Sequence, residues 1–199
     1  VLPKFLNCAC ASKPILRQRQ KVVPLAEGKV LEIGIGSGLN LPFYEKSKID
    51  EVWGLDPSEE LSAMARIVAD QESIEVNFIS SGAEEIPLPD DHFDSVLVTY
   101  TMCTIPEVLR ANQEIRRVLR VGGKMIFCEH GEAPDENIRK WQKRINPFWG
   151  KIAGGCNINR KIPSLIKDSG FDIVEMEEMY LPNTPKIAGY NYWGFALAK

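Results

Sequence analysis

The sequence has little of what marks several large protein classes. No apolar run approaches the ~18 residues of a membrane span. Histidine occurs only as His92 and His130, the five cysteines form no Cys-x-x-Cys pair, and Cys, Asp and Glu do not cluster along the chain, so we expect no metal ion. A strongly basic stretch, an Asn-Pro-Pro-Tyr or Pro-Cys motif and an appended binding domain are also absent, so we expect no nucleic-acid partner.

Charge is distributed unevenly between the N-terminal segment and the rest of the chain. Five basic residues precede the first acidic residue, Glu27, although the 199-residue chain has a net charge of −3. Such a segment permits weak peripheral contact with an anionic membrane, but a helix that packs on the domain is the favoured interpretation. We therefore expect a basic N-terminal arm or helix, 1–27, on a single domain, 28–199, in a cytoplasmic protein with reduced thiols.

Short apolar runs alternate with helix-like patterns, which is typical of a parallel sheet covered by helices on both faces. Apolar residues at helical spacing follow Ser58, a candidate N-cap, and predict a helix over 58–71. A second such pattern starts at Val108 and is closed by Gly122 and Gly123. The first five strands are expected at 29–34, 51–56, 75–80, 93–100 and 124–129.

The pattern changes after the fifth strand. We expect a helix that ends before Pro147, a short helix that ends at Gly170, and two strands at 171–180 and 188–198. Only about seven residues separate these strands, too few for a parallel crossover, so the last pair must be antiparallel. The aromatic residues of this region suit an apolar pocket and an ordinary core equally well.

Three glycines directly follow the first strand as Gly34-x-Gly36-x-Gly38, and a helix is expected to begin near Leu39 with Pro42 in its first turn. Glycines let the backbone turn sharply and approach a ligand, whose polar groups would meet free N–H donors. The dinucleotide fingerprint needs its last glycine at position 39, so the spacing argues against a pyrophosphate ligand.

Two further features lie at the same edge of the expected sheet. Asp56 ends the second strand, where a carboxylate can accept hydrogen bonds from two ribose hydroxyls, although an Asp before Pro57 also suits a plain turn. The stretch "SGAEEIPLPDDHFD" (81–94) replaces a crossover helix by a loop that could hold a flat base through backbone N–H groups and Glu84.

Together, "VLEIGIGSG", "GLDPS", "GAEEIPLPDDHFD", "EIRRVLRVGGK" and the terminal hairpin resemble the class I S-adenosylmethionine-dependent methyltransferases over roughly 28–199. The resemblance implies an α/β Rossmann-like fold with sheet order 3-2-1-4-5-7-6, and S-adenosyl-L-methionine as cofactor with S-adenosyl-L-homocysteine as product. The implied cofactor-binding residues are Glu32, Gly34, Gly36, Ser37, Gly38, Asp56, Pro57, Gly82, Ala83, Glu84 and Thr99.

The resemblance also implies which part of the cofactor each residue meets. The three glycines would line the methionine and ribose part, and Asp56 would take the ribose hydroxyls. Ala83 and Glu84 would flank adenine, and Thr99 would lie beneath the sulfonium. Gly82 stands where many relatives have an Asp that contacts the adenine amino group.

Within the family, "CTIPE", "KMIFCEH" and "GGCNINR" are similar to the alkyl-thiol methyltransferases of the methyltransferase-like group. The acceptor is therefore expected to be a small thiol or apolar molecule. His130 is the candidate catalytic residue, as base or acceptor contact, with a structural hydrogen bond as its alternative. The candidate substrate residues are Cys103, Asn157 and Arg160.

Three other functions stay open at this point. Quinone C-methyltransferases also resemble the first 130 residues, so a quinone- or lipid-type C- or O-methyltransferase is one alternative. An NAD(P)-dependent oxidoreductase is the second, and a non-catalytic cofactor-binding protein is the third, because fold alone does not prove activity.

Overall fold

The computed structural model describes residues 10–198 and contains one seven-stranded sheet. The strand order is β3-β2-β1-β4-β5-β7-β6, and only β7 runs antiparallel to its neighbours, so the predicted fold class and order are confirmed. The strands are β1 (Gly28–Ile33), β2 (Ile49–Leu55), β3 (Val76–Ile79), β4 (Phe93–Thr99), β5 (Leu119–His130), β6 (Phe171–Tyr180) and β7 (Tyr190–Ala198).

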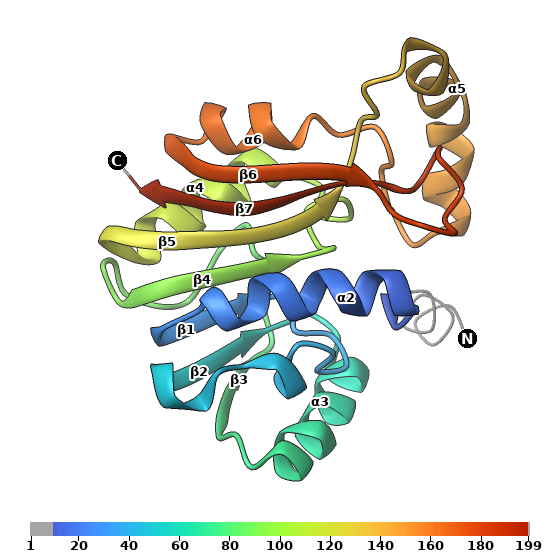
Figure 1. Ribbon diagram of the computed structural model, residues 1–199. Coiled ribbons are helices and arrows are strands. Elements are labelled where there is room, and N and C mark those ends of the chain that lie inside the picture. The colour runs from blue at the N-terminus through green and yellow to red at the C-terminus, as the bar shows by residue number, and fades with distance from the viewer. Residues whose placement is uncertain (1–9, 199) are drawn as a thin grey trace.

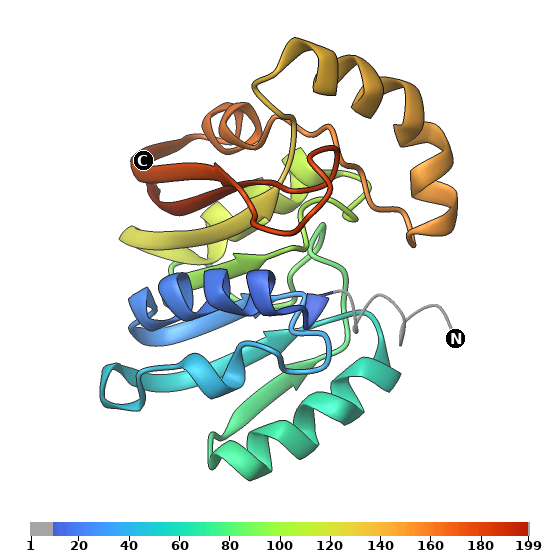
Figure 2. The same ribbon diagram turned by 45° about the vertical axis from the view of Figure 1, so that its right-hand side comes forward.

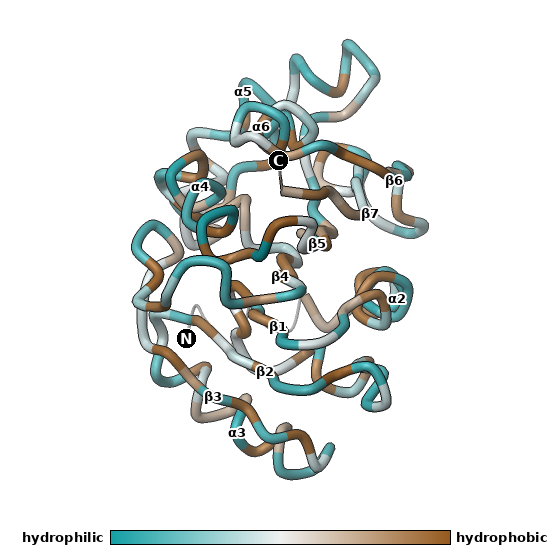
Figure 3. Tube along the Cα trace, turned by 90° about the vertical axis from the view of Figure 1, so that its left-hand side faces the viewer, coloured by the Kyte–Doolittle hydropathy of each residue, from teal (hydrophilic) through white to brown (hydrophobic). Residues whose placement is uncertain are grey.

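Helices cover both faces of the sheet, with α2 on one side and α4 on the other (Figure 3). Their bounds are α2 (Lys13–Val22), α3 (Glu59–Glu72), α4 (Val108–Val118), α5 (Glu136–Ile152) and α6 (Ile162–Asp168). Short 3-10 turns form at η1 (Val23–Leu25), η2 (Leu41–Phe43) and η3 (Lys46–Lys48).

The alternation of side chains along each strand creates two cores. In β4, Val96 and Val98 pack in the core that α4 and α6 cover, whereas Leu97 packs in the core that α2 and α3 cover. The parallel strands are apolar on both faces because helices exclude water from each of them. Because these strands run parallel, their carboxyl ends meet at one edge of the sheet, where α5 stands out from the body in both Figure 1 and Figure 2.

The basic N-terminal segment includes a helix that packs on the domain. In α2, Gln18, Arg19 and Val22 are buried, and the Lys21 ammonium lies 4.3 Å from the ring centre of Trp193 in β7. The assignment of 1–27 as an arm distinct from the domain stays a prediction, and its first nine residues lie outside the described chain. Within residues 10–198, no helix has the length and apolar content that crossing a bilayer requires.

Ser58 is the N-cap of α3, as predicted, and its Oγ accepts a hydrogen bond from the Leu61 N–H at 3.3 Å. The prediction of a helix that begins near Leu39 is wrong, because the chain forms only the turns η2 and η3 before β2 begins. About ten residues separate Gly38 from that strand, so an amphipathic helix and its two connections do not fit.

Two other predicted helix ends are wrong. Helix α5 continues through Pro147, since Pro147 and Lys143 are exposed and the carbonyl that loses its N–H partner can bond to water. Helix α4 ends at Val118, and Gly122 and Gly123 lie within β5 at a register shift rather than at a helix end.

Candidate active site

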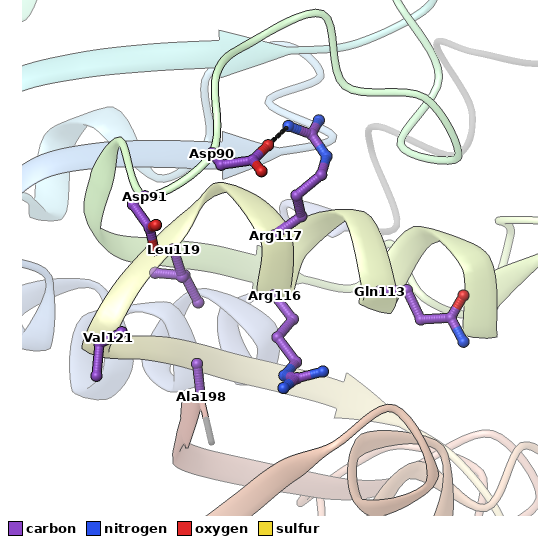
Figure 4. Close-up of a pocket in the computed structure, with 8 residues that line it drawn as sticks. All are labelled: Asp90, Asp91, Gln113, Arg116, Arg117, Leu119, Val121 and Ala198. Atoms are coloured by element: carbon purple, nitrogen blue, oxygen red, sulfur yellow. Dashed lines mark hydrogen bonds and ion pairs between the residues drawn. The ribbon is translucent and has the colours of Figure 1, made fainter.

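Two hollows lie at opposite edges of the sheet. The smaller, of about 260 Å³, is lined by residues at the start of β5 and the end of β7, and its Arg117 forms an ion pair of 2.7 Å with Asp90 (Figure 4). The larger, of about 720 Å³, lies at the carboxyl edge, where ligands bind in open α/β sheets. Its volume is that of a small-molecule site, roughly 300–1,000 Å³.

We call this larger hollow the edge cavity. It is lined by the loops that follow β1, β2 and β4, by His130 at the end of β5, by α2, by the C-terminal end of α5 and by the β6–β7 connection. Of the residues predicted from the sequence, it brings together Gly34, Gly36, Ser37, Asp56, Thr99, Cys103 and His130.

The three glycines of the loop after β1 differ in what surrounds them. A Cβ on Gly34 would lie 2.5 Å from the Thr101 side chain, and one on Gly38 would lie 3.1 Å from the Cα of Ala65, so these two permit close internal packing. A Cβ on Gly36 would meet nothing nearer than a carbonyl oxygen at 3.8 Å. Gly36 has φ +54° and faces open space, so this is the glycine over which a ligand can approach the backbone.

Asp56 holds the glycine loop in place while it faces the cavity. Its Oδ2 accepts the Gly36 N–H at 2.9 Å and its Oδ1 accepts the Ser58 N–H at 2.8 Å. Asp56 is 7% exposed, and burial raises the pKa of its carboxyl although both N–H groups oppose that shift. The position at the end of β2 therefore combines a structural role with a free face toward a ligand.

A buried polar network lies beneath the loop. The Arg19 Nη1 donates to Asn40 Oδ1 and Thr99 Oγ1, both at 2.7 Å, and Asn40 Nδ2 donates to Glu32 Oε1 at 2.9 Å. Tyr44 donates to the other oxygen of Glu32 at 2.8 Å. Burial raises the pKa of Glu32 to about 7 despite these hydrogen bonds and the charge of Arg19.

Several predicted site residues do not line the edge cavity. Glu32 serves the network described above, and Ala83 is buried in the core beneath α4. The amide of Asn157 donates to the Cys103 carbonyl at 3.0 Å, and Arg160 donates to the carbonyls of Met102 and Ile105. The full set outside the lining is Glu32, Gly38, Pro57, Gly82, Ala83, Glu84, Asn157 and Arg160.

The structure gathers a cluster that the sequence does not show. Cys103 follows β4, His130 ends β5 and Cys156 lies between α5 and α6, yet one ligand atom of each lies within 4.8 Å of the other two. The Cys156 Sγ and His130 Nε2 atoms are 3.3 Å apart. We call these three residues the Cys-His cluster.

The members of this cluster shift one another's protonation. Hydrogen bonding between the two thiols lowers the pKa of Cys156 and raises that of Cys103, and burial adds to the rise at Cys103. Burial would lower the pKa of His130, but the Cys156 sulfur and the charge of Glu129 raise it, and the net shift is upward. The two shifts act in the same sense, toward a more acidic Cys156 thiol and a more basic His130 imidazole.

Sequence reasoning also missed residues that line the cavity from distant segments. Cys10, Arg19, Tyr100 and Asn191 all do so. Arg19 belongs to a basic segment with no motif, and its orientation depends on packing of α2 against the sheet. Of the aromatic residues after β5, Trp149 faces the cavity, while Tyr190, Tyr192 and Trp193 are buried in the core.

Comparison with known proteins agrees with this architecture. Residues 31–127 match the model of a methyltransferase domain. Thiol S-methyltransferase TMT1B of Homo sapiens is 30% identical over 175 residues, which cover 82% of this chain and 71% of that protein. Demethylmenaquinone methyltransferase of Thermus thermophilus is 30% identical over 179 residues, which cover 84% of this chain and 81% of that protein.

A solved structure shows the same fold at lower identity. Geranyl diphosphate methyltransferase in complex with SAM superposes with a TM-score of 0.71 at 14% identity, over 92% of this chain and 85% of that one. These similarities do not favour an oxidoreductase. The sheet has the strand order of these proteins and carries a glycine loop at its carboxyl edge, and the relatives are methyltransferases. The chain therefore belongs to the methyltransferase domain family, in its class I group.

Proposed function

We propose that the chain is an S-adenosylmethionine-dependent methyltransferase that acts on a small thiol. The observation that carries this proposal is a single cavity with the glycine loop and Asp56 on the β2 side and the Cys-His cluster on the β5 side. Methyl transfer is an in-line displacement, so a cavity that holds donor and acceptor together supplies most of what the reaction needs.

Three features of the cavity fit the cofactor. Gly36 leaves open space above the backbone, and Asp56 offers acceptor capacity to ribose hydroxyls. The Nε of Arg19 is buried without a hydrogen-bond partner among the described residues, which suits the carboxylate of the cofactor's amino-acid part. When bound, S-adenosylmethionine supplies a methyl group made electrophilic by its sulfonium.

The remaining residues have proposed supporting roles. Thr99 lies between Arg19 and Asn40 at the cavity wall, which suits contact beneath the sulfonium. The loop that contains Gly82, Ala83 and Glu84 follows β3, which is paired with β2 beside Asp56, and this neighbourhood supports its assignment to adenine. His130 is proposed to contact the acceptor because it lines the β5 side of the cavity.

The acceptor class rests on the chemistry of the site. The human relative is a thiol S-methyltransferase, and a thiolate needs orientation more than a strong base. The described cysteines are all free thiols, so we also propose a reducing compartment such as the cytoplasm. Apolar residues such as Ile15, Leu39 and Leu61 line the cavity as well, which favours a quinone- or lipid-type acceptor as the second candidate.

Isothermal titration calorimetry with S-adenosylmethionine, S-adenosylhomocysteine and NADH tests the cofactor. We expect the first two to bind and NADH not to bind. Asp56→Ala should weaken binding about 5- to 150-fold, equivalent to 1–3 kcal/mol, because charge-assisted hydrogen bonds are lost. Asp50→Ala, at the exposed start of the same strand, is the matched control. Binding of NADH alone, or an unchanged affinity of folded Asp56→Ala, would contradict the proposal.

A methyl-transfer screen then separates the acceptor classes. Alkyl thiols, a demethylated quinone and an ethanolamine lipid are offered with labelled cofactor, and we expect transfer to the thiols. Transfer only to the quinone or the lipid would favour the second candidate. Cofactor binding without transfer to any of them would favour a non-catalytic protein.

A further inference from the structure

The Cys-His cluster combines two thiols and an imidazole, which are the ligand types that zinc prefers. Catalytic zinc sites use three protein ligands, and a set of two Cys and one His is among them, with a fourth position left for water or substrate. The three ligand atoms here lie within 4.8 Å of one another.

The separation between the Cys156 sulfur and the His130 nitrogen agrees with tetrahedral coordination. With Zn–S bonds of about 2.3 Å and Zn–N bonds of about 2.0–2.1 Å, a sulfur and a nitrogen ligand lie roughly 3.5 Å apart. The Cys156 Sγ and His130 Nε2 atoms are 3.3 Å apart, so an ion can bind between them with small side-chain movements.

The two cysteine-bearing loops are fixed to each other. The Asn157 N–H and its Nδ2 both donate to the carbonyl of Cys103, at 2.9 and 3.0 Å. Asn146 of α5 in turn donates to Asn157 Oδ1 at 2.9 Å, and Arg160 donates to carbonyls on both sides of Cys103. These bonds hold the cluster together in the absence of an ion, as a preorganised site requires.

All three residues line the edge cavity, so a fourth position can face it. Cys10 also lines the cavity but is not part of the group of three. We propose that Cys103, His130 and Cys156 bind one Zn²⁺ with a fourth position open to the cavity, and that the acceptor thiolate coordinates there. This inference rests on the proposed function, and it gives His130 the role of a ligand rather than a base.

Methyl transfer to a metal-bound thiolate begins with loss of the thiol proton. On coordination the acceptor thiol releases its proton to solvent, because the metal stabilises the thiolate. The thiolate sulfur then forms a bond to the methyl carbon, the bond from that carbon to the sulfonium breaks, and its electron pair stays on the sulfur of S-adenosylhomocysteine. The product is a neutral thioether, which is a weaker ligand than a thiolate and leaves the metal.

Zinc binding by the full chain is the first test. The reduced protein is freed of metal with a chelator and titrated with Zn²⁺ in competition with a chromophoric indicator. We expect one equivalent to bind tightly, and Cys103→Ser or Cys156→Ser to weaken binding at least 100-fold. Cys128→Ser is the matched control, since Cys128 is buried but outside the group. No tight binding, or equal loss in Cys128→Ser, overturns the proposal.

Two further variants probe the ligand set. His130→Gln should weaken Zn²⁺ binding as the serine variants do, whereas Cys10→Ser should leave it unchanged. A loss in Cys10→Ser as large as that in Cys103→Ser would mean four protein ligands and would overturn the open position. Far-UV circular dichroism, which does not depend on cofactor binding, confirms that each variant is folded, so weaker Zn²⁺ binding reports on the ligand set.

Cobalt substitution separates this proposal from the proposed function. An alkyl thiol added to the Co²⁺ protein without cofactor should increase thiolate-to-cobalt absorption, and an unchanged spectrum overturns the open position. A spectral change without methyl transfer to any thiol would support the metal site and contradict the proposed function. Full methyl transfer by the metal-free protein would support the proposed function and contradict the role of the metal site.

Discussion

The two sides of the edge cavity are built in different ways. On the β2 side, Asp56 bonds the backbone of Gly36 and Ser58, all within two short loops that directly follow strands. On the β5 side, the cluster comes from three separate segments that are joined by side chains such as Asn157 and Gln142. The first side depends on local loop chemistry, whereas the second depends on the packing of distant segments.

The largest expected effect concerns the β5 side. Gln142 of α5 is fully buried, and its amide bonds four backbone groups on three segments, Gly131 O, Ala133 N, Ile158 O and Ile187 O, at 2.8–3.0 Å. Gln142→Leu should lower the free energy of unfolding by about 3 kcal/mol, because several buried polar groups lose their partners.

Chemical denaturation of the Gln142 variant measures this loss, and Gln113→Leu at an exposed position of α4 is the matched control. Cofactor affinity of the folded fraction should change less than acceptor turnover. An equal loss of both would show that the two sides are not independent.

The second effect concerns the buried charge on the β2 side. The pKa of Glu32 is about 7 in the folded chain against an ordinary 4.5, so the folded state binds the proton more tightly. Its contribution to stability is therefore greatest below pH 4.5 and is lost as the pH rises toward 7. Glu32→Gln keeps an acceptor for Asn40 and should be more stable than the native chain at pH 8, by about 1–3 kcal/mol, but not at pH 4.5.

Denaturation at several pH values checks this sign. Glu75→Gln, at an exposed position, serves as the control and should shift stability little at any pH. A Glu32 variant that is less stable than the native chain at pH 8 would mean that the charge is needed beside Arg19.

The third effect is local to the loop that carries Asp56. Ser58→Ala removes the N-cap of α3 and should cost about 1 kcal/mol of unfolding free energy, while Ser58→Asp keeps a capping oxygen and should cost little. Thermal unfolding measures both variants. Equal losses in the two would show that Ser58 acts through something other than its cap.

The smallest effect concerns the surface of α5. Lys140 pairs with Glu136 at 2.8 Å, but both side chains are about 70% exposed. Lys140→Ala should therefore change the unfolding free energy by less than about 0.5 kcal/mol. A larger loss by chemical denaturation would mean that this exposed pair within α5 stabilises the helix more than a solvated ion pair should.

Much of the β2 side was predictable because its signals are local. The strand before the glycine loop, the position of Asp56 and the N-cap of α3 each follow from a few adjacent residues. The helix expected near Leu39 failed for a tertiary reason, since the segment before β2 leaves no room for it. The role of Arg19 was not predictable, because its segment carries only a charge bias and the contact with Thr99 needs the packed α2.

By itself, the sequence determined the layered α/β fold and the loop with Asp56, because apolar periodicity and turn chemistry act over a few residues. The strand order followed from the resemblance to a known family and not from those local patterns. Only the tertiary structure decided that Cys103, His130 and Cys156 meet. Parallel pairing brings the ends of β4 and β5 to one edge, and Asn157 and Gln142 hold the segment after α5 against them. No spacing along the chain encodes that meeting, since it depends on contacts between residues far apart in sequence.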